Sequence, residues 1–75
     1  MIVGSTRGYI ELDIDGRTVR VHGEGFHGEL VDYVLDRSSI THWNDGSEVT
    51  DSERESILDD LRASALQHGL TIEIE

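Results

Sequence analysis

The segment from Tyr9 to His22 limits how this chain can fold more than any other feature. Apolar and polar residues alternate along it on both sides of Asp15-Gly16. This pattern predicts a β-hairpin with a two-residue type I′ turn, because that turn requires positive φ at both central positions. The turn sets the register and so places an apolar and a polar face on the hairpin. The predicted pairs are Ile14 with Arg17, Asp13 with Thr18, Leu12 with Val19, Glu11 with Arg20, and Ile10 with Val21.

Three further strands are predicted after the hairpin. Leu30–Leu35 is rich in β-branched and aromatic residues, and Ile40–Trp43 is expected to form a short strand. The last segment, Leu70–Glu75, alternates with Leu70 pointing inward. Residues 23–28 contain three glycines, which predicts a loop or a bulge between the hairpin and the next strand.

One helix is expected between the last two of these strands. Thr50 with Glu53 three residues later matches a capping box at its start, and Gly69 is placed to end it. The element order β-β-β-β-α-β therefore indicates an α+β fold, in which the helix packs on one face of a small, mostly antiparallel sheet. The expected apolar stripe of the helix consists of Ile57, Leu58, Leu61 and Ala65, with Leu66 at its margin.

Length and charge restrict the functions that this chain can have. A chain of 75 residues is expected to form a single domain, 1–75. The 16 acidic and 6 basic residues give a net charge of −10, which disfavours binding to nucleic acid or to an anionic membrane. No apolar run approaches a membrane span or the core of a signal peptide, so we expect a cytoplasmic protein.

Residues that could carry chemistry are sparse. His22, Glu24 and His27 form a weak candidate for a metal site, but their spacing matches no established ligand pattern, so no metal or other cofactor is expected. The glycines of residues 23–28 match G-x-G-x-x-G, although a strand-like segment follows them where a phosphate-binding helix would be needed. No serine lies in a nucleophile-elbow pattern. These observations predict a protein that is not an enzyme.

The acidic residues around the glycine-rich segment predict a contact surface. Glu24 and Glu29 flank Phe26, the sole Phe of the chain. An apolar ring between carboxylates would suit a basic protein partner. The alternative is a solvated acidic surface that only raises solubility. Trp43 is expected to anchor the core beneath the helix, with an interface role as the alternative.

Several short motifs resemble one known family. They are Thr6-Arg7-Gly8-x-Ile10, Asp15-Gly16-Arg17-x-Val19-x-Val21-x-Gly23-Glu24, Ile40-x-x-Trp43, Thr50-x-x-Glu53 and Gly69-Leu70-x-Ile72-Glu73-Ile74. Together they cover nearly the whole chain and resemble the immunity protein 74 family, small immunity proteins of bacterial polymorphic-toxin systems. Members of that family often have Pro shortly after the Trp, where this chain has Asn44-Asp45-Gly46.

The resemblance implies a single α+β domain that binds and neutralises a cognate protein toxin. We expect stoichiometric occlusion as the mode of neutralisation, and a nuclease with a basic cleft is the toxin class that the net charge of this chain would suit. Two alternatives stay open on the residues alone. One is a small acidic regulatory domain that self-associates through a sheet edge, and the other is a metal-binding module. The sequence leaves the oligomeric state open. The residues expected to contact the toxin are Glu24, Phe26, His27, Glu29 and Asp45.

Overall fold

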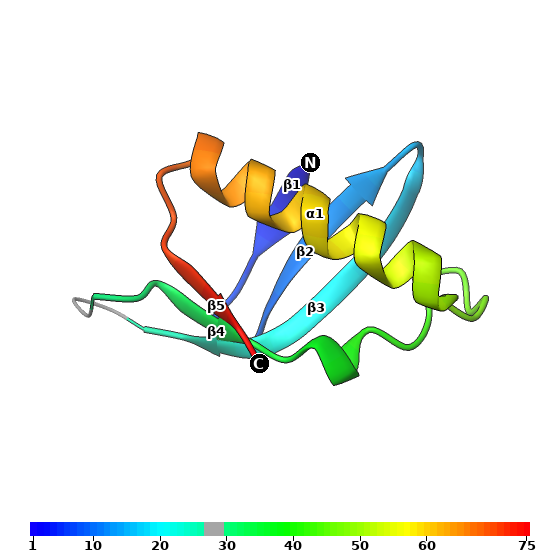
Figure 1. Ribbon diagram of the computed structural model, residues 1–75, viewed down its shortest axis with the longest axis horizontal. Coiled ribbons are helices and arrows are strands. Elements are labelled where there is room, and N and C mark those ends of the chain that lie inside the picture. Colours follow the sequence, from blue (N-terminus) through cyan, green and yellow to red (C-terminus); the bar gives the residue numbers. More distant parts are fainter. Residues whose placement is uncertain (27–29) are drawn as a thin grey trace.

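The computed structural model describes residues 1–26 and 30–75. Helix α1 lies across one face of a twisted sheet and leaves the opposite face uncovered (Figure 1). The predicted α+β fold with one helix on a small sheet is therefore confirmed. The elements are β1 (Ile2–Ser5), β2 (Tyr9–Ile14), β3 (Arg17–Gly25), β4 (Tyr33–Leu35), a 3₁₀ turn (Arg37–Ser39), α1 (Asp51–Gln67) and β5 (Ile72–Ile74).

The strands lie in the sheet in chain order, from β1 to β5. Neighbouring strands from β1 to β4 are antiparallel, whereas β5 runs parallel to β4. A parallel pair needs a crossover connection, and α1 provides it between β4 and β5. The sheet is mostly antiparallel, as the sequence predicts.

The β2–β3 hairpin has the predicted register at all five pairs, from Ile14 with Arg17 to Ile10 with Val21. Asp15 and Gly16 have φ angles of 53° and 87°, as a type I′ turn requires. The Gly16 amide also donates to Asp13 Oδ1 at 2.9 Å, which holds the turn closed.

The core lies between the hairpin and α1, and both ends of α1 are at the predicted residues. At its start, the Thr50 side chain accepts a hydrogen bond from the Glu53 amide, while the Glu53 carboxylate accepts one from the Thr50 amide. Gly69, with φ of 69°, closes a Schellman motif at the other end. Leu66, predicted at the margin of the apolar stripe of the helix, is 82% exposed. The inward residues predicted for the hairpin, the helix and the segment before it are buried, namely Ile10, Leu12, Val19 and Val21 of the hairpin, Ile57, Leu58, Leu61 and Ala65 of α1, and Trp43 before the helix. Leu70, Ile72 and Ile74, which the alternation of the last segment also predicts to point inward, are only partly buried.

Two predicted strands differ from those observed. Ile40–Trp43 is not a strand, because only His42 pairs, in an isolated antiparallel bridge with Glu48. The Trp43 amide donates to the Ser47 carbonyl at 2.9 Å, so the chain turns back directly after the bridge. The sheet still has five strands, because it includes β1, which the sequence pattern did not indicate. In the segment Leu30–Leu35, only Tyr33–Leu35 pairs as a strand, and in Leu70–Glu75 only Ile72–Ile74 does.

Candidate functional site

The open face of the sheet is the face opposite α1. Alternate residues of a strand point to opposite faces, so the positions between the buried ones point away from the helix. The register places Glu24 of β3 beside Val34 of β4, and Val34 beside Glu73 of β5. The other open-face positions are Tyr9, Glu11 and Asp13 of β2 and Thr18, Arg20 and His22 of β3.

The middle of the open face consists of side chains that bind one another. Arg20 donates to Glu11 Oε1 at 2.9 Å and lies over the Tyr9 ring, 4.5 Å from its centroid. Asn44 reaches over from the loop before α1 and donates to Glu11 and to Thr18 Oγ1, at 3.1 and 2.9 Å. The hydrogen bond from Arg20 holds the pKa of Glu11 below its ordinary value. These polar groups already have partners within the chain.

The end of the open face near β4 has a different character. Phe26, which follows β3, lines a shallow hollow together with Leu30, Val31 and Val34, and we call this the apolar hollow. Phe26 is 40% exposed and Leu30 is 96% exposed. Contiguous exposed apolar side chains on a small protein are typical of an interaction surface.

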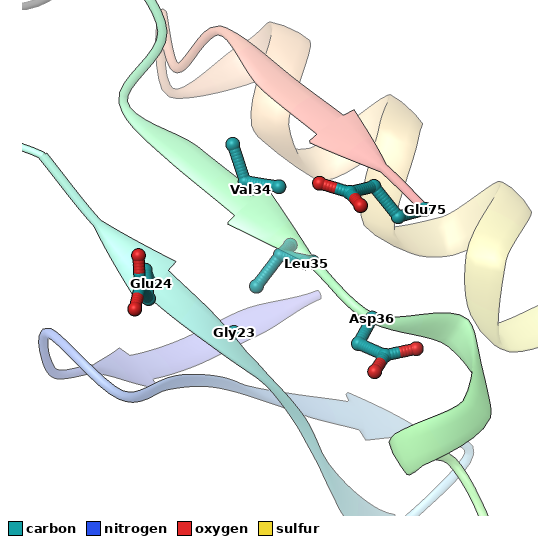
Figure 2. A pocket seen from close by; sticks show the side chains of 6 residues that line it. All are labelled: Gly23, Glu24, Val34, Leu35, Asp36 and Glu75. Carbon is teal, nitrogen blue, oxygen red and sulfur yellow. The ribbon is translucent and has the colours of Figure 1, made fainter.

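A second hollow adjoins the first at Val34. The carboxylates of Glu24, Asp36 and Glu75 lie around it, and we call it the acidic hollow (Figure 2). The hydroxyl and the amide of Ser38 both donate to Asp36 and lower the pKa of its carboxyl. Five ion pairs form within residues 1–26 and 30–75, and none of them includes a carboxylate of the acidic hollow.

Asp45 lies far from both hollows. Its neighbour Asn44 bonds through its backbone to Thr18, six residues along β3 from Glu24, which corresponds to about 20 Å of extended strand. The Asp45 carboxylate accepts from the Ser47 hydroxyl and amide, at 2.6 and 2.9 Å, and these bonds lower its pKa. Asp45 therefore shapes the loop before the helix.

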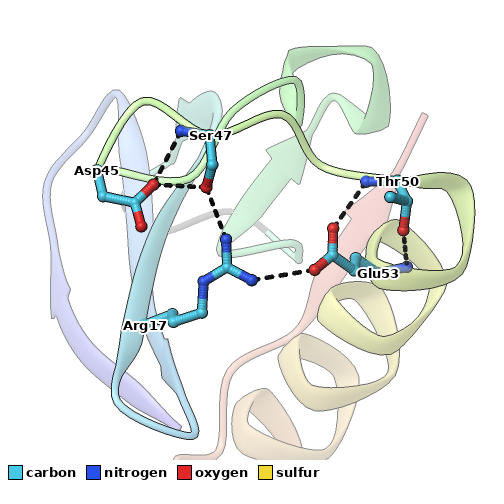
Figure 3. A network of polar contacts seen from close by, with 5 residues as sticks. All are labelled: Arg17, Asp45, Ser47, Thr50 and Glu53. Atoms are coloured by element: carbon cyan, nitrogen blue, oxygen red, sulfur yellow. Dashed lines mark hydrogen bonds and ion pairs between the residues drawn. The ribbon is translucent and has the colours of Figure 1, made fainter.

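The same loop joins the hairpin to α1 (Figure 3). Arg17 donates to Ser47 Oγ at 2.7 Å and to Glu53 Oε2 at 3.0 Å, and its guanidinium lies over the Trp43 ring, 4.1 Å from the centroid. The hydrogen bond from the Thr50 amide is the largest of several causes that keep the pKa of Glu53 below its ordinary value. Arg17, Ser47, Thr50 and Glu53 each have a hydrogen-bond partner within the chain, which indicates a structural role.

The structure thus brings together two of the predicted contact residues, Glu24 and Phe26, and separates Asp45 from them. His27 and Glu29 lie outside the described residues. Sequence reasoning missed Leu30, Val31 and Val34, because it assigned them to one continuous strand and did not distinguish its two faces. The signal that could have found Val34 is its alternation with Tyr33 and Leu35, which point toward the core.

Metal and membrane signals are weak in the part of the chain that the structure describes. His22 and Glu24 share the open face, and the His22 ring lies 5.7 Å from that of Tyr9. Within residues 1–26 and 30–75 no three His, Cys, Asp or Glu side chains are grouped to hold a metal ion. The candidate formed by His22, Glu24 and His27 includes a residue outside those ranges and stays a prediction. No helix in the described ranges has the length and apolar character to cross a membrane.

Comparison with known proteins identifies the family. No curated protein and no solved structure matches the chain. The family model described as immunity protein 74 matches residues 2–75, which is essentially the whole chain. The resemblance drawn from the short motifs is confirmed, and the chain belongs to the immunity protein 74 family.

Proposed function

We propose that this chain is a bacterial immunity protein that binds a cognate toxin of a polymorphic-toxin system and blocks it by stoichiometric occlusion. The observation that carries the proposal is the open face, which ends in exposed apolar side chains bordered by carboxylates. An apolar centre with a polar rim is the usual anatomy of a protein–protein interface. Membership of the immunity protein 74 family supports the same function.

The proposed contact surface contains Glu24 and Phe26, with the expected contribution of His27 and Glu29. Asp45 would take part only if the toxin also reached the opposite end of β3. A toxin nuclease would need a basic cleft for phosphates, and a domain of net charge −10 is complementary to such a cleft. We infer that the chain acts in the cytoplasm as an inhibitor, without catalysis and without a cofactor.

Stoichiometric inhibition can be tested by titration. The test uses the toxin domain that we expect the gene directly upstream to encode. This domain is made by cell-free synthesis so that its toxicity does not limit expression, and the chain is added to it in increasing amounts. Toxin activity should fall linearly and reach its minimum at about one equivalent, because occlusion consumes one inhibitor for each toxin. Complete inhibition far below one equivalent would indicate enzymatic inactivation and would contradict the proposal.

One observation favours a second candidate function, self-association through β1. Residues 1–6 carry no charged side chain, although 29% of the chain is charged. In the described part of the sheet β1 pairs on one side only, and Val3 is 50% exposed. Uncharged edge strands invite pairing with another chain. Sedimentation equilibrium would show a dimer that Val3→Lys dissociates, whereas a monomer at all concentrations would exclude this candidate.

A further inference from the structure

Three side chains form a row across the end of the open face. Val34 of β4 lies between Glu24 of β3 and Glu73 of β5, because the register pairs it with both. Both glutamates are exposed, while Val34 is partly exposed. An apolar side chain with a carboxylate on each side is thus presented on one surface of three neighbouring strands.

Val34 also belongs to both hollows. On one side it continues into the apolar hollow with Phe26, Leu30 and Val31. On the other side it borders the acidic hollow, where the carboxylates have no ion-pair partner among the described residues (Figure 2). The two hollows therefore form a continuous surface with an apolar half and an anionic half.

We infer that the apolar hollow is the docking site for a basic segment of the toxin, which inserts an apolar side chain between flanking arginine or lysine residues. This inference rests on the proposed function and adds the place of contact and the chemistry of the partner. Charge complementarity selects this occupant, because cations beside the apolar side chain would meet Glu24, Glu73 and Glu75. A second copy of this chain docked on the same surface would bring these carboxylates against each other, which is unfavourable.

The two halves of the surface should affect different rate constants. Exposed apolar side chains that become desolvated hold a complex together, so their truncation accelerates dissociation. Carboxylates act over longer distances and mainly accelerate association, in a manner that salt screens. The structure thus predicts one set of substitutions for each kinetic step.

The dissociation arm uses Phe26→Ala combined with Leu30→Ala. Leu30 is 96% exposed and Phe26 is 40% exposed, so the double variant should stay folded, with a denaturant midpoint only slightly below that of the wild type. We expect its dissociation rate constant from the upstream-encoded toxin domain to rise about tenfold or more. Leu66→Ala is the matched control, because Leu66 is 82% exposed on α1, and its dissociation rate should stay within about twofold of the wild type.

The association arm uses Glu24→Gln combined with Glu73→Gln. Asp15→Asn combined with Glu55→Gln is its control, since it removes the same net charge from exposed positions elsewhere. At low salt the first pair should lower the association rate constant several-fold and the control pair clearly less. Near 1 M salt, where the Debye length is about 3 Å, the difference should disappear.

The outcomes separate the inference from the proposed function. If the wild type binds the toxin and both test variants behave like their controls, the docking site is wrong while the immunity function stands. If the wild type does not bind the toxin, both the docking site and the proposed immunity function are wrong. If the Phe26 and Leu30 substitutions dissociate a dimer of this chain and leave toxin binding unchanged, a second copy occupies the hollow and the inference is overturned.

Discussion

Gly23→Ala should destabilise the fold, because β3 and β4 approach each other closely at this residue. A Cβ at Gly23 would lie 2.1 Å from the Val34 carbonyl oxygen and 2.7 Å from Leu35 Cα. Both are backbone atoms, so neither can rotate away, and the strands would have to separate by about 1 Å to restore ordinary contact. The substitution therefore acts on the pairing of the two strands.

The magnitude follows from the hydrogen bonds on either side of the contact. The Asp36 amide donates to the His22 carbonyl at 2.8 Å, and the Phe26 amide donates to the Asp32 carbonyl at 2.9 Å. A separation of about 1 Å takes both beyond the usual limit of about 3.2 Å. With a net value of about 1 kcal/mol for each bond, Gly23→Ala should lower the free energy of unfolding by about 2 kcal/mol. For a domain of this size the melting temperature should fall by about 8–16 °C.

Urea denaturation followed by circular dichroism measures this loss. Gly4→Ala in β1 is the matched control, because nothing lies within 4 Å of the Cβ that it would add. The control should be neutral or slightly stabilising, since alanine restricts the unfolded chain more than glycine does. Equal stabilities of the two variants would refute the close approach of β3 and β4.

Three other predictions concern the turn, the helix cap and metal dependence. Gly16→Val should lower the free energy of unfolding by about 1 kcal/mol or more, because a β-branched residue resists positive φ; an unchanged melting temperature would contradict the turn. Because folding lowers the pKa of Glu53, its carboxylate stabilises the fold at pH values above its ordinary pKa of 4.5. This stabilisation is lost as the pH falls through the pKa that Glu53 has in the folded protein. The stability difference between wild type and Glu53→Gln, measured by urea denaturation at several pH values, should therefore shrink on acidification, and a constant difference would contradict the role assigned to the charge. A chelator should leave the unfolding midpoint unchanged, whereas a clear loss of stability would support the site at His22, Glu24 and His27.

The hairpin and the helix were predictable because each is determined by nearby residues. The Asp15-Gly16 turn and the alternation around it agree on one register, and a shift by one residue would expose the apolar face. The helix likewise has a signal at each end, Thr50 with Glu53 at its start and Gly69 after its last turn. Local rules were sufficient for these two elements, which contribute most of the core.

The misassigned strands show where local rules are insufficient. β1 is four residues long, and Val3 forms a bulge between the pairs Ile2 with Leu12 and Gly4 with Glu11, so its alternation is interrupted. Ile40 and Trp43 are both buried, but they are three residues apart with two exposed residues between them, which is not the period of a strand.

The candidate site was only partly predictable for a related reason. Phe26 and Glu24 could be named from composition, because an aromatic ring among glycines and acids is unusual in a core. The exposure of Leu30 and Val34 depends on where β4 begins and on which strands flank it, and Val34 lies between two glutamates only because β5 returns parallel to β4. That return is a property of the topology, which no local pattern in the chain encodes.

This dependence on strand pairing links stability to binding. Gly23→Ala should move Val34 relative to Glu24, whereas Gly16→Val disturbs the distant end of the same strand, about seven residues or about 23 Å away. At a temperature where both variants are folded, Gly23→Ala should weaken toxin binding about tenfold, because the row of side chains that we propose as the toxin contact is displaced by about 1 Å and shape complementarity is lost. The Gly16→Val variant should bind the toxin with an affinity within about twofold of the wild type.

Isothermal titration calorimetry with the upstream-encoded toxin domain measures both affinities. Equal losses in the two variants would mean that binding follows overall stability, and equal retention would mean that the toxin contacts a surface other than the end of β3 and β4.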